Sequence, residues 1–151
     1  EIGVRLVGSE MCIRDRLSKH HYMIGVIANG KSKIKQFRLH SLGNMHVINY
    51  LTTSETVGYR KPHPKIFEDM IDQLGVKPSE IMYVGDDALN DVAPARAMGM
   101  VSVWYKQEDA ELEPLTEEVD YTITTIEELL KILPDNFETE GEEQHGNGFN
   151  Y

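Results

Sequence analysis

Short apolar runs alternate with segments of helical pattern along most of this chain. The clearest helix is expected over residues 64–74, because its apolar residues share one face, Pro64 suits the first turn and Gly75 suits the C-terminal end. The expected strands cover residues 22–27, 47–51, 81–84, 100–104 and 121–123. This alternation predicts βαβ units, so the expected fold class is α/β, with a parallel sheet covered by helices on both faces.

Further helices are expected between these strands. One covers about residues 90–98, with Pro94 in or near its first turn. Another follows the last strand, where Thr125 and Glu128 form a capping-box pattern. A basic segment after Gly30 is also expected to be helical, and its positive residues are interpreted as a solvated face: Lys31, Lys33, Lys35 and Arg38.

The length of 151 residues allows one domain with a real core. Residues 1–16 have no initiating methionine and resemble a translated sequencing adaptor, so we expect a non-native extension there. The domain is expected over residues 17–134. Residues 135–151 are acidic and Gly-rich without periodicity, which predicts a disordered tail.

The net charge of −10 and the pI near 5.0 disfavour binding to nucleic acid or to anionic membrane surfaces. No run approaches the ~20 apolar residues that a membrane span needs. The single cysteine, Cys12, excludes an internal disulfide. We therefore expect a cytoplasmic protein without nucleic-acid or membrane partners, and its oligomeric state stays open.

Acidic residues gather directly after the apolar run at 81–84, in the segment VGDDALND. Carboxylates at Asp86 and Asp91 cost several kcal/mol out of bulk water unless a cation or donor meets them. Ligands of open parallel sheets bind at the C-terminal ends of the strands, where Asn29-Gly30 and Lys61 are also expected. Hard oxygen ligands favour magnesium, and Lys61 offers positive charge for a phosphate.

Three segments carry a family resemblance: IGVIANG, GYRKPHPKIFEDMIDQLGV and IMYVGDDALNDVAPARAMGM. They resemble motifs II, III and IV of the haloacid dehalogenase (HAD) superfamily, subfamily I, over roughly residues 20–133. The resemblance implies a Mg²⁺-dependent hydrolase, most often a phosphatase of a small phosphorylated metabolite that forms an aspartyl-phosphate.

The resemblance also implies roles for individual residues. Asp86 would bind Mg²⁺, and Asp91 would support that site directly or through water. Lys61 would be the catalytic residue that neutralises charge between nucleophile and phosphate. The loop formed by Ala28, Asn29 and Gly30 would donate hydrogen bonds to phosphate oxygens.

Two departures from the family pattern stand out. Ala28 occupies a position where the family usually has serine or threonine, and losing one such donor commonly costs ~2.7–4 kcal/mol of transition-state stabilisation. The Asp-x-Asp motif I, its central strand and the cap segment are missing, and that strand would lie between those carrying Asn29 and Asp86. We therefore expect an incomplete Rossmann-like sheet, and an inactive chain as given.

Other interpretations stay open. Without the nucleophile the protein could be a non-catalytic HAD-like binding or regulatory module, and the same scaffold could support dehalogenation or phosphomutase chemistry. The acids could also be an ordinary turn in which Asn90 or Asp91 caps a helix.

Overall fold

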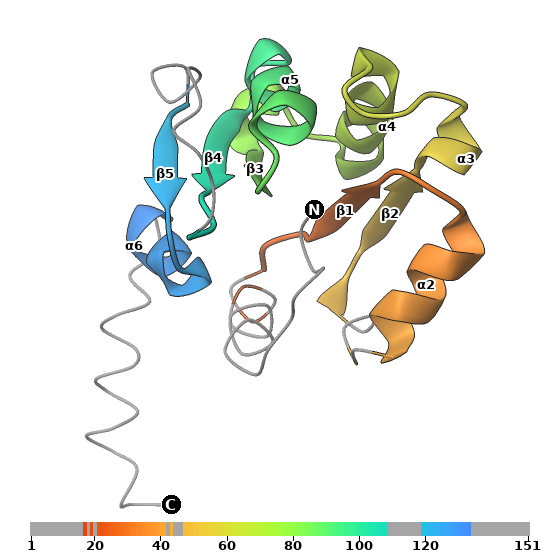
Figure 1. Ribbon diagram of the computed structural model, residues 1–151, viewed down its shortest axis with the longest axis horizontal. Coiled ribbons are helices and arrows are strands. Elements are labelled where there is room, and N and C mark those ends of the chain that lie inside the picture. Colours follow the sequence, from red (N-terminus) through yellow and green to blue (C-terminus); the bar gives the residue numbers. More distant parts are fainter. Residues whose placement is uncertain are drawn as a thin grey trace, which may run out of the picture.

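The computed structural model describes residues 17, 19, 21–41, 43, 47–108 and 119–133. The expected extension at residues 1–16 and the expected tail at 135–151 lie outside this part of the chain. The described elements follow in chain order (Figure 1): β1 Gly25–Ala28, α2 Ser32–Ser41, β2 Tyr50–Thr53, α3 Ser54–Val57, α4 Pro64–Leu74, a 3₁₀ turn Pro78–Glu80, β3 Met82–Gly85, a π-helical turn Ala88–Val92, α5 Ala93–Ala97, β4 Val101–Tyr105, β5 Tyr121–Ile123, a 3₁₀ turn Ile126–Glu128 and α6 Leu129–Ile132.

The strands form two parallel sheets. β1 pairs with β2, and β3, β4 and β5 pair in that order. Within the described residues no strand joins β1 to β3. The parallel pairing agrees with the expected α/β class, and a missing strand between β1 and β3 stays a prediction.

Helix α4 links the two sheets through the largest apolar cluster. Its residues Ile66, Phe67 and Met70 pack with Ile27 of β1 and Tyr83 of β3. The approach of α4 to β1 is close, because a Cβ at Gly25 would lie 2.6 Å from the sulfur of Met70. A side chain at residue 25 would therefore force the end of the Met70 side chain to move.

A second cluster covers the other face of the larger sheet. Val84 of β3 and Val103 of β4 pack there with Ile123 of β5 and Leu129 of α6. α4 and α5 thus lie on one side of the strands, and α2 and α6 lie on the other (Figure 1). Helices on both faces were expected from the alternating pattern.

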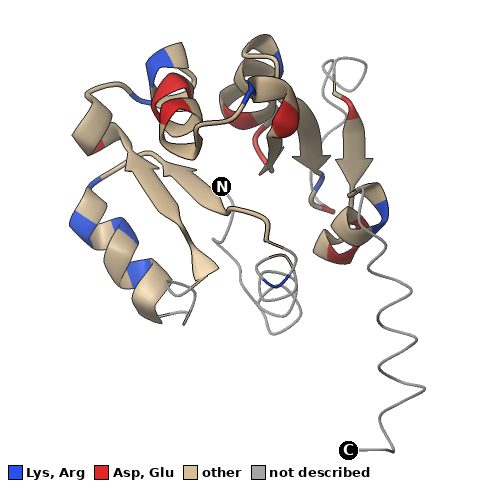
Figure 2. Ribbon diagram, turned by 180° about the vertical axis from the view of Figure 1, so that it is seen from behind, with Lys and Arg blue, Asp and Glu red and all other residues tan. Residues whose placement is uncertain are grey.

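The basic residues of α2 lie mostly in solvent. The helix carries Lys33, Lys35 and Arg38 without an acidic residue, and Lys33 and Arg38 are exposed (Figure 2). None of the helices in the described part of the chain is long and apolar enough to span a bilayer.

Several sequence-based boundaries were wrong. The strand expected at 47–51 lies at Tyr50–Thr53, and the helix expected at 90–98 is divided into a π-helical turn and α5. The capping box at Thr125 is not formed, because Thr125 makes no side-chain cap bond. Instead the Glu128 carboxylate accepts hydrogen bonds from the backbone and hydroxyl of Thr124.

Candidate active site

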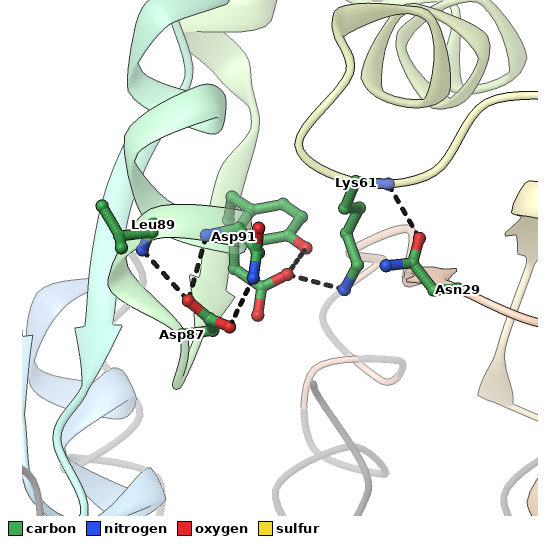
Figure 3. Close-up of polar contacts among 7 residues, drawn as sticks. Asn29, Lys61, Asp87, Leu89 and Asp91 are labelled. Carbon is green, nitrogen blue, oxygen red and sulfur yellow. Dashed lines mark hydrogen bonds and ion pairs between the residues drawn. The ribbon is translucent and has the colours of Figure 1, made fainter.

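Lys61 and Asp91 form a buried ion pair. Lys61 Nζ lies 2.6 Å from Asp91 Oδ1, and the two side chains are 5% and 2% exposed (Figure 3). Lys61 comes from the connection between α3 and α4, whereas Asp91 lies in the π-helical turn after β3. Each charge would be costly without the other, since a buried charge needs a partner and further hydrogen bonds. The structure thus places the predicted lysine against one of the two predicted metal-site acids.

Asn29 fixes the backbone of the same lysine. Its side-chain oxygen accepts a hydrogen bond of 2.7 Å from the Lys61 backbone N–H (Figure 3). The connection that carries Lys61 is therefore held against the end of β1. Lys61 thus contacts Asn29 through its backbone and Asp91 through its ammonium group.

The other two predicted phosphate-binding positions are largely engaged within the protein. The methyl group of Ala28 is buried, and Ala28 pairs with Thr53 across β1 and β2. The backbone N–H of Gly30 donates to Ser54 Oγ at 2.8 Å. A phosphate at this loop would have to compete with Ser54 for that donor.

Asp86 follows β3 and is held by β4 and the segment after it. Gln107 Nε2 donates to Asp86 Oδ2 at 2.9 Å, and Trp104 Nε1 donates to the Asp86 carbonyl oxygen at 3.1 Å. Trp104 is buried, so its position is set by packing with Ala88 and Val92. These two contacts fix both the backbone and the carboxylate of Asp86.

Asp87 is the residue that caps the turn after β3. Its Oδ1 accepts from the backbone N–H groups of Leu89 and Asn90, and its Oδ2 accepts from the Asn90 amide (Figure 3). Burial raises the pKa of Asp87, but the hydrogen bonds from Asn90 and Leu89 outweigh it and hold the pKa below its usual value. The cap is therefore Asp87, which corrects the interpretation that Asn90 or Asp91 would cap the helix.

Two carboxylates near the end of β3 are candidate ligands of a metal ion. The segment after β3 offers the carboxylates of Asp86 and Asp91, which are hard oxygen donors. Within the described residues no three His, Cys, Asp or Glu side chains are grouped to hold a metal by themselves. Mg²⁺ is commonly held by one or two carboxylates, with waters and substrate phosphate as its other ligands. The two acids therefore fit Mg²⁺ better than a metal that needs a closed cage of protein ligands.

Three neighbours of these acids were not predicted from the sequence: Tyr83, Trp104 and Gln107. Tyr83 Oη donates to Asp91 Oδ1 at 3.0 Å. The alternation of β3 places Tyr83 and Gly85 on one face, and this signal could have pointed to Tyr83. Trp104 and Gln107 had no comparable signal, because their contacts with Asp86 depend on how β4 pairs with β3.

A family profile described as haloacid dehalogenase-like hydrolase matches residues 12–105 of the chain. The chain belongs to this family. A glyceraldehyde 3-phosphate phosphatase from Pyrococcus furiosus is 38% identical over 121 residues, which are 78% of this chain and 50% of that protein. A pyrimidine 5′-nucleotidase from Escherichia coli is 32% identical over 111 residues, which are 73% of this chain and 49% of that protein. The chain thus spans about half the length of these relatives.

A solved structure supports the same assignment of fold. The crystal structure of a HAD phosphatase from Thermococcus onnurineus superimposes with a TM-score of 0.79 at 30% sequence identity. The superposition covers 86% of this chain and 59% of that chain. The predicted HAD-like α/β fold is therefore confirmed.

Proposed function

We propose that the whole protein is a Mg²⁺-dependent phosphatase of a small phosphorylated metabolite, which works through an aspartyl-phosphate intermediate. The observation that carries the proposal is the buried contact between Lys61 Nζ and Asp91 Oδ1, on a chain that belongs to the HAD-like hydrolases. The phosphatase names of the similar proteins support the reaction class. They also suggest phosphorylated sugars, trioses or nucleotides as the first substrates to test.

Each residue would have one task. Mg²⁺, when bound, would neutralise charge on the phosphate. Asp86 and Asp91 would hold the ion through their carboxylate oxygens. Lys61 would neutralise a phosphate oxygen, since its ammonium group is already placed beside Asp91 without a search through many rotamers. Asn29 would keep Lys61 in place through the bond to its backbone N–H.

The nucleophile would come from outside the residues that carry this site. We propose that it lies on a strand between β1 and β3, because these strands belong to separate sheets and Lys61 and Asp91 meet between them. The chain matches about half the length of its relatives. The strand and a cap would lie in the part of the whole protein that corresponds to their other half. Residues 1–151 alone would then bind the ligand groups weakly and would not turn over substrate.

Oligonucleotides and membranes are not proposed as partners, because the chain carries a net charge of −10. We propose a cytoplasmic enzyme, residues 17–134 as part of its core domain, and residues 1–16 and 135–151 as segments outside that core.

The test is a hydrolysis assay on the whole protein, encoded by the gene with its natural upstream sequence. Phosphate release would be measured from p-nitrophenyl phosphate, glyceraldehyde 3-phosphate and pyrimidine 5′-nucleotides, with Mg²⁺ and with a chelator. We expect Mg²⁺-dependent release by the whole protein and none by residues 1–151 alone. A 2-haloacid would be included, since halide release without metal would indicate dehalogenation instead.

Complete inactivity of the whole protein on a broad panel of phosphomonoesters would contradict the proposal. If the upstream sequence also lacked an Asp-x-Asp motif, a non-catalytic binding or regulatory module would replace the phosphatase as the explanation of the site.

A further inference from the structure

Tyr83 connects the apolar core to the buried acid. It lies on β3 and is 8% exposed, and its ring packs against Phe67 of α4 with the ring centroids 5.5 Å apart and the planes tilted by 58°. Its hydroxyl group donates a hydrogen bond of 3.0 Å to Asp91 Oδ1. The ring is thus held by packing in the core, while the hydroxyl group reaches the candidate site.

The Tyr83 hydroxyl and the Lys61 ammonium group donate to the same oxygen. Lys61 Nζ lies 2.6 Å and Tyr83 Oη lies 3.0 Å from Asp91 Oδ1. Two donors on one oxygen restrict rotation of the carboxylate group, because rotation would break both bonds at once. Both donors therefore contribute to the orientation of the Asp91 carboxylate.

Asp91 also lies very close to the backbone of β3 at Gly85. A Cβ at Gly85 would lie 2.6 Å from Asp91 Cβ, 3.1 Å from Cγ and 3.2 Å from Oδ2. Asp91 can lie this close to the strand only because residue 85 lacks a side chain. The lysine and the tyrosine thus bond the carboxylate, and the glycine leaves the room that it occupies beside β3.

The two donors differ in stiffness. Lys61 carries its charge on a flexible stem of four carbons. The tyrosine ring has only two rotatable side-chain bonds, and packing against Phe67 restricts them further. Tyr83 is therefore the stiffer of the two donors and can fix the Asp91 carboxylate relative to the core.

We propose that Tyr83 is a positioning residue, whose hydroxyl group holds the Asp91 carboxylate in the orientation that serves the metal site. This inference rests on the proposed function, in which Asp91 supports Mg²⁺ binding. Residues that orient a metal ligand by hydrogen-bonding to it commonly change the metal affinity by 10–100-fold when they are mutated. Tyr83 would act through Asp91 and would not touch the substrate.

The test compares Tyr83→Phe with Tyr50→Phe in the whole protein. Both changes remove one phenolic oxygen, and Tyr50 packs against the same apolar cluster from β2. Mg²⁺ binding would be measured by titration calorimetry without substrate, and kcat and KM at saturating Mg²⁺. For Tyr83→Phe we expect a Mg²⁺ dissociation constant about tenfold higher and a KM within about twofold of the wild-type value. Tyr50→Phe should leave both values unchanged.

A double-mutant cycle separates this role from a general loss of packing. In an Asp91→Ala background both the carboxylate and the acceptor for the Tyr83 hydroxyl group are gone, so Tyr83→Phe should change the Mg²⁺ dissociation constant by less than about twofold. A tenfold effect that persists in this background would overturn the inference, and so would a Tyr83→Phe protein that binds Mg²⁺ as the wild type does.

The failure of the inference and the failure of the proposed function give different results. If the wild-type protein hydrolyses phosphomonoesters with Mg²⁺ and Tyr83→Phe matches it, the role of Tyr83 is overturned and the phosphatase stands. If the wild-type protein neither binds Mg²⁺ nor hydrolyses any ester, both are overturned.

Discussion

Two ion pairs of this protein join distant parts of the chain in very different surroundings. Lys61 and Asp91 lie 2.6 Å apart with side chains that are 5% and 2% exposed, whereas Arg96 and Asp120 lie 3.0 Å apart with side chains that are 44% and 40% exposed. An exposed pair contributes little to folding, and a buried pair is often no more stabilising than apolar residues of the same size. Stability alone therefore gives little reason to keep the buried pair, and its place between the two sheets favours a chemical role.

The partners of the two acids sharpen this contrast. Asp120 accepts from the backbone N–H and the hydroxyl group of Ser102 as well as from Arg96, so it ties the start of β5 to β4. Asp91 accepts from Lys61 and Tyr83, whose own positions depend on the core and on Asn29. The exposed acid organises its local backbone, while the buried acid organises charged and aromatic side chains from several elements.

The largest effect is expected from Lys61→Met in the whole protein. The change leaves Asp91 buried without its cation, so the free energy of unfolding should fall by about 3–5 kcal/mol and phosphatase activity should be lost. Chemical denaturation and phosphate release would measure the two effects. Lys65→Met is the matched control, because the Lys65–Glu68 pair is 3.7 Å long and exposed, and it should change the free energy of unfolding by less than about 1 kcal/mol.

A double variant separates stability from chemistry. Lys61→Met combined with Asp91→Asn removes both charges, and the asparagine oxygen can still accept from the Tyr83 hydroxyl. Most of the lost stability should return, while activity stays absent. If activity returned together with stability, the ion pair would be a structural feature only.

Gly85→Ala is expected to have the next largest effect. The added Cβ would lie 2.6 Å from Asp91 Cβ, so the turn after β3 must move, at a cost of about 1–3 kcal/mol in the free energy of unfolding and with weaker Mg²⁺ binding. Gly75→Ala serves as the control, because its positive φ of 68° also costs about 1–2 kcal/mol but nothing lies within 4 Å of the added Cβ. Unchanged Mg²⁺ binding in Gly85→Ala would show that the position of Asp91 does not matter to the metal.

Arg96→Gln should have a small effect. It removes the exposed ion pair with Asp120, so the free energy of unfolding should change by less than about 1 kcal/mol, and activity should stay at the wild-type level. Thermal denaturation and the phosphatase assay would check this. If Arg96→Gln lowered the free energy of unfolding and the activity as much as Lys61→Met does, the contrast between the two ion pairs would be wrong.

The smallest effect is expected at acidic pH. The hydrogen bond from the Ser102 backbone, together with the Ser102 hydroxyl and Arg96, holds the pKa of Asp120 below its usual value against the effect of burial. A carboxyl group with a lowered pKa contributes stability that is present above its unfolded pKa of about 3.9 and is lost as the pH falls through the folded value. Asp120→Asn should therefore lose less stability than the wild type between about pH 5 and pH 2. Equal acid sensitivity in urea titrations at each pH would contradict this assignment.

The sequence was most informative where periodicity and local chemistry agreed. Helix α4 begins at Pro64 and ends at Leu74 as predicted, because its apolar stripe, proline and glycine indicate the same boundaries. Strand β2 begins three residues and ends two residues later than predicted, because hydropathy favours Val47 and Ile48 over Thr52 and Thr53. The two threonines are nevertheless buried, since Asp69 and Ser32 bond their hydroxyl groups.

At the candidate site, too, the sequence predicted individual residues better than the contacts between elements. Motifs singled out Asn29, Lys61, Asp86 and Asp91, whose roles in catalysis stay predictions, and the structure links Asn29 to Lys61 and Lys61 to Asp91. The supporting contacts of Tyr83 and Gln107 depend on packing between elements, which a linear pattern does not encode. The same holds for Ser54, whose bond to Gly30 spans 24 positions of sequence.

The most direct test of the central claim is a crystal structure of the whole protein with Mg²⁺ and inorganic phosphate. We expect the ion about 2.0–2.1 Å from a carboxylate oxygen of Asp86, and Lys61 Nζ within hydrogen-bond distance of a phosphate oxygen. Mg²⁺ and phosphate bound together at a place that includes neither Asp86 nor Lys61 would contradict the account.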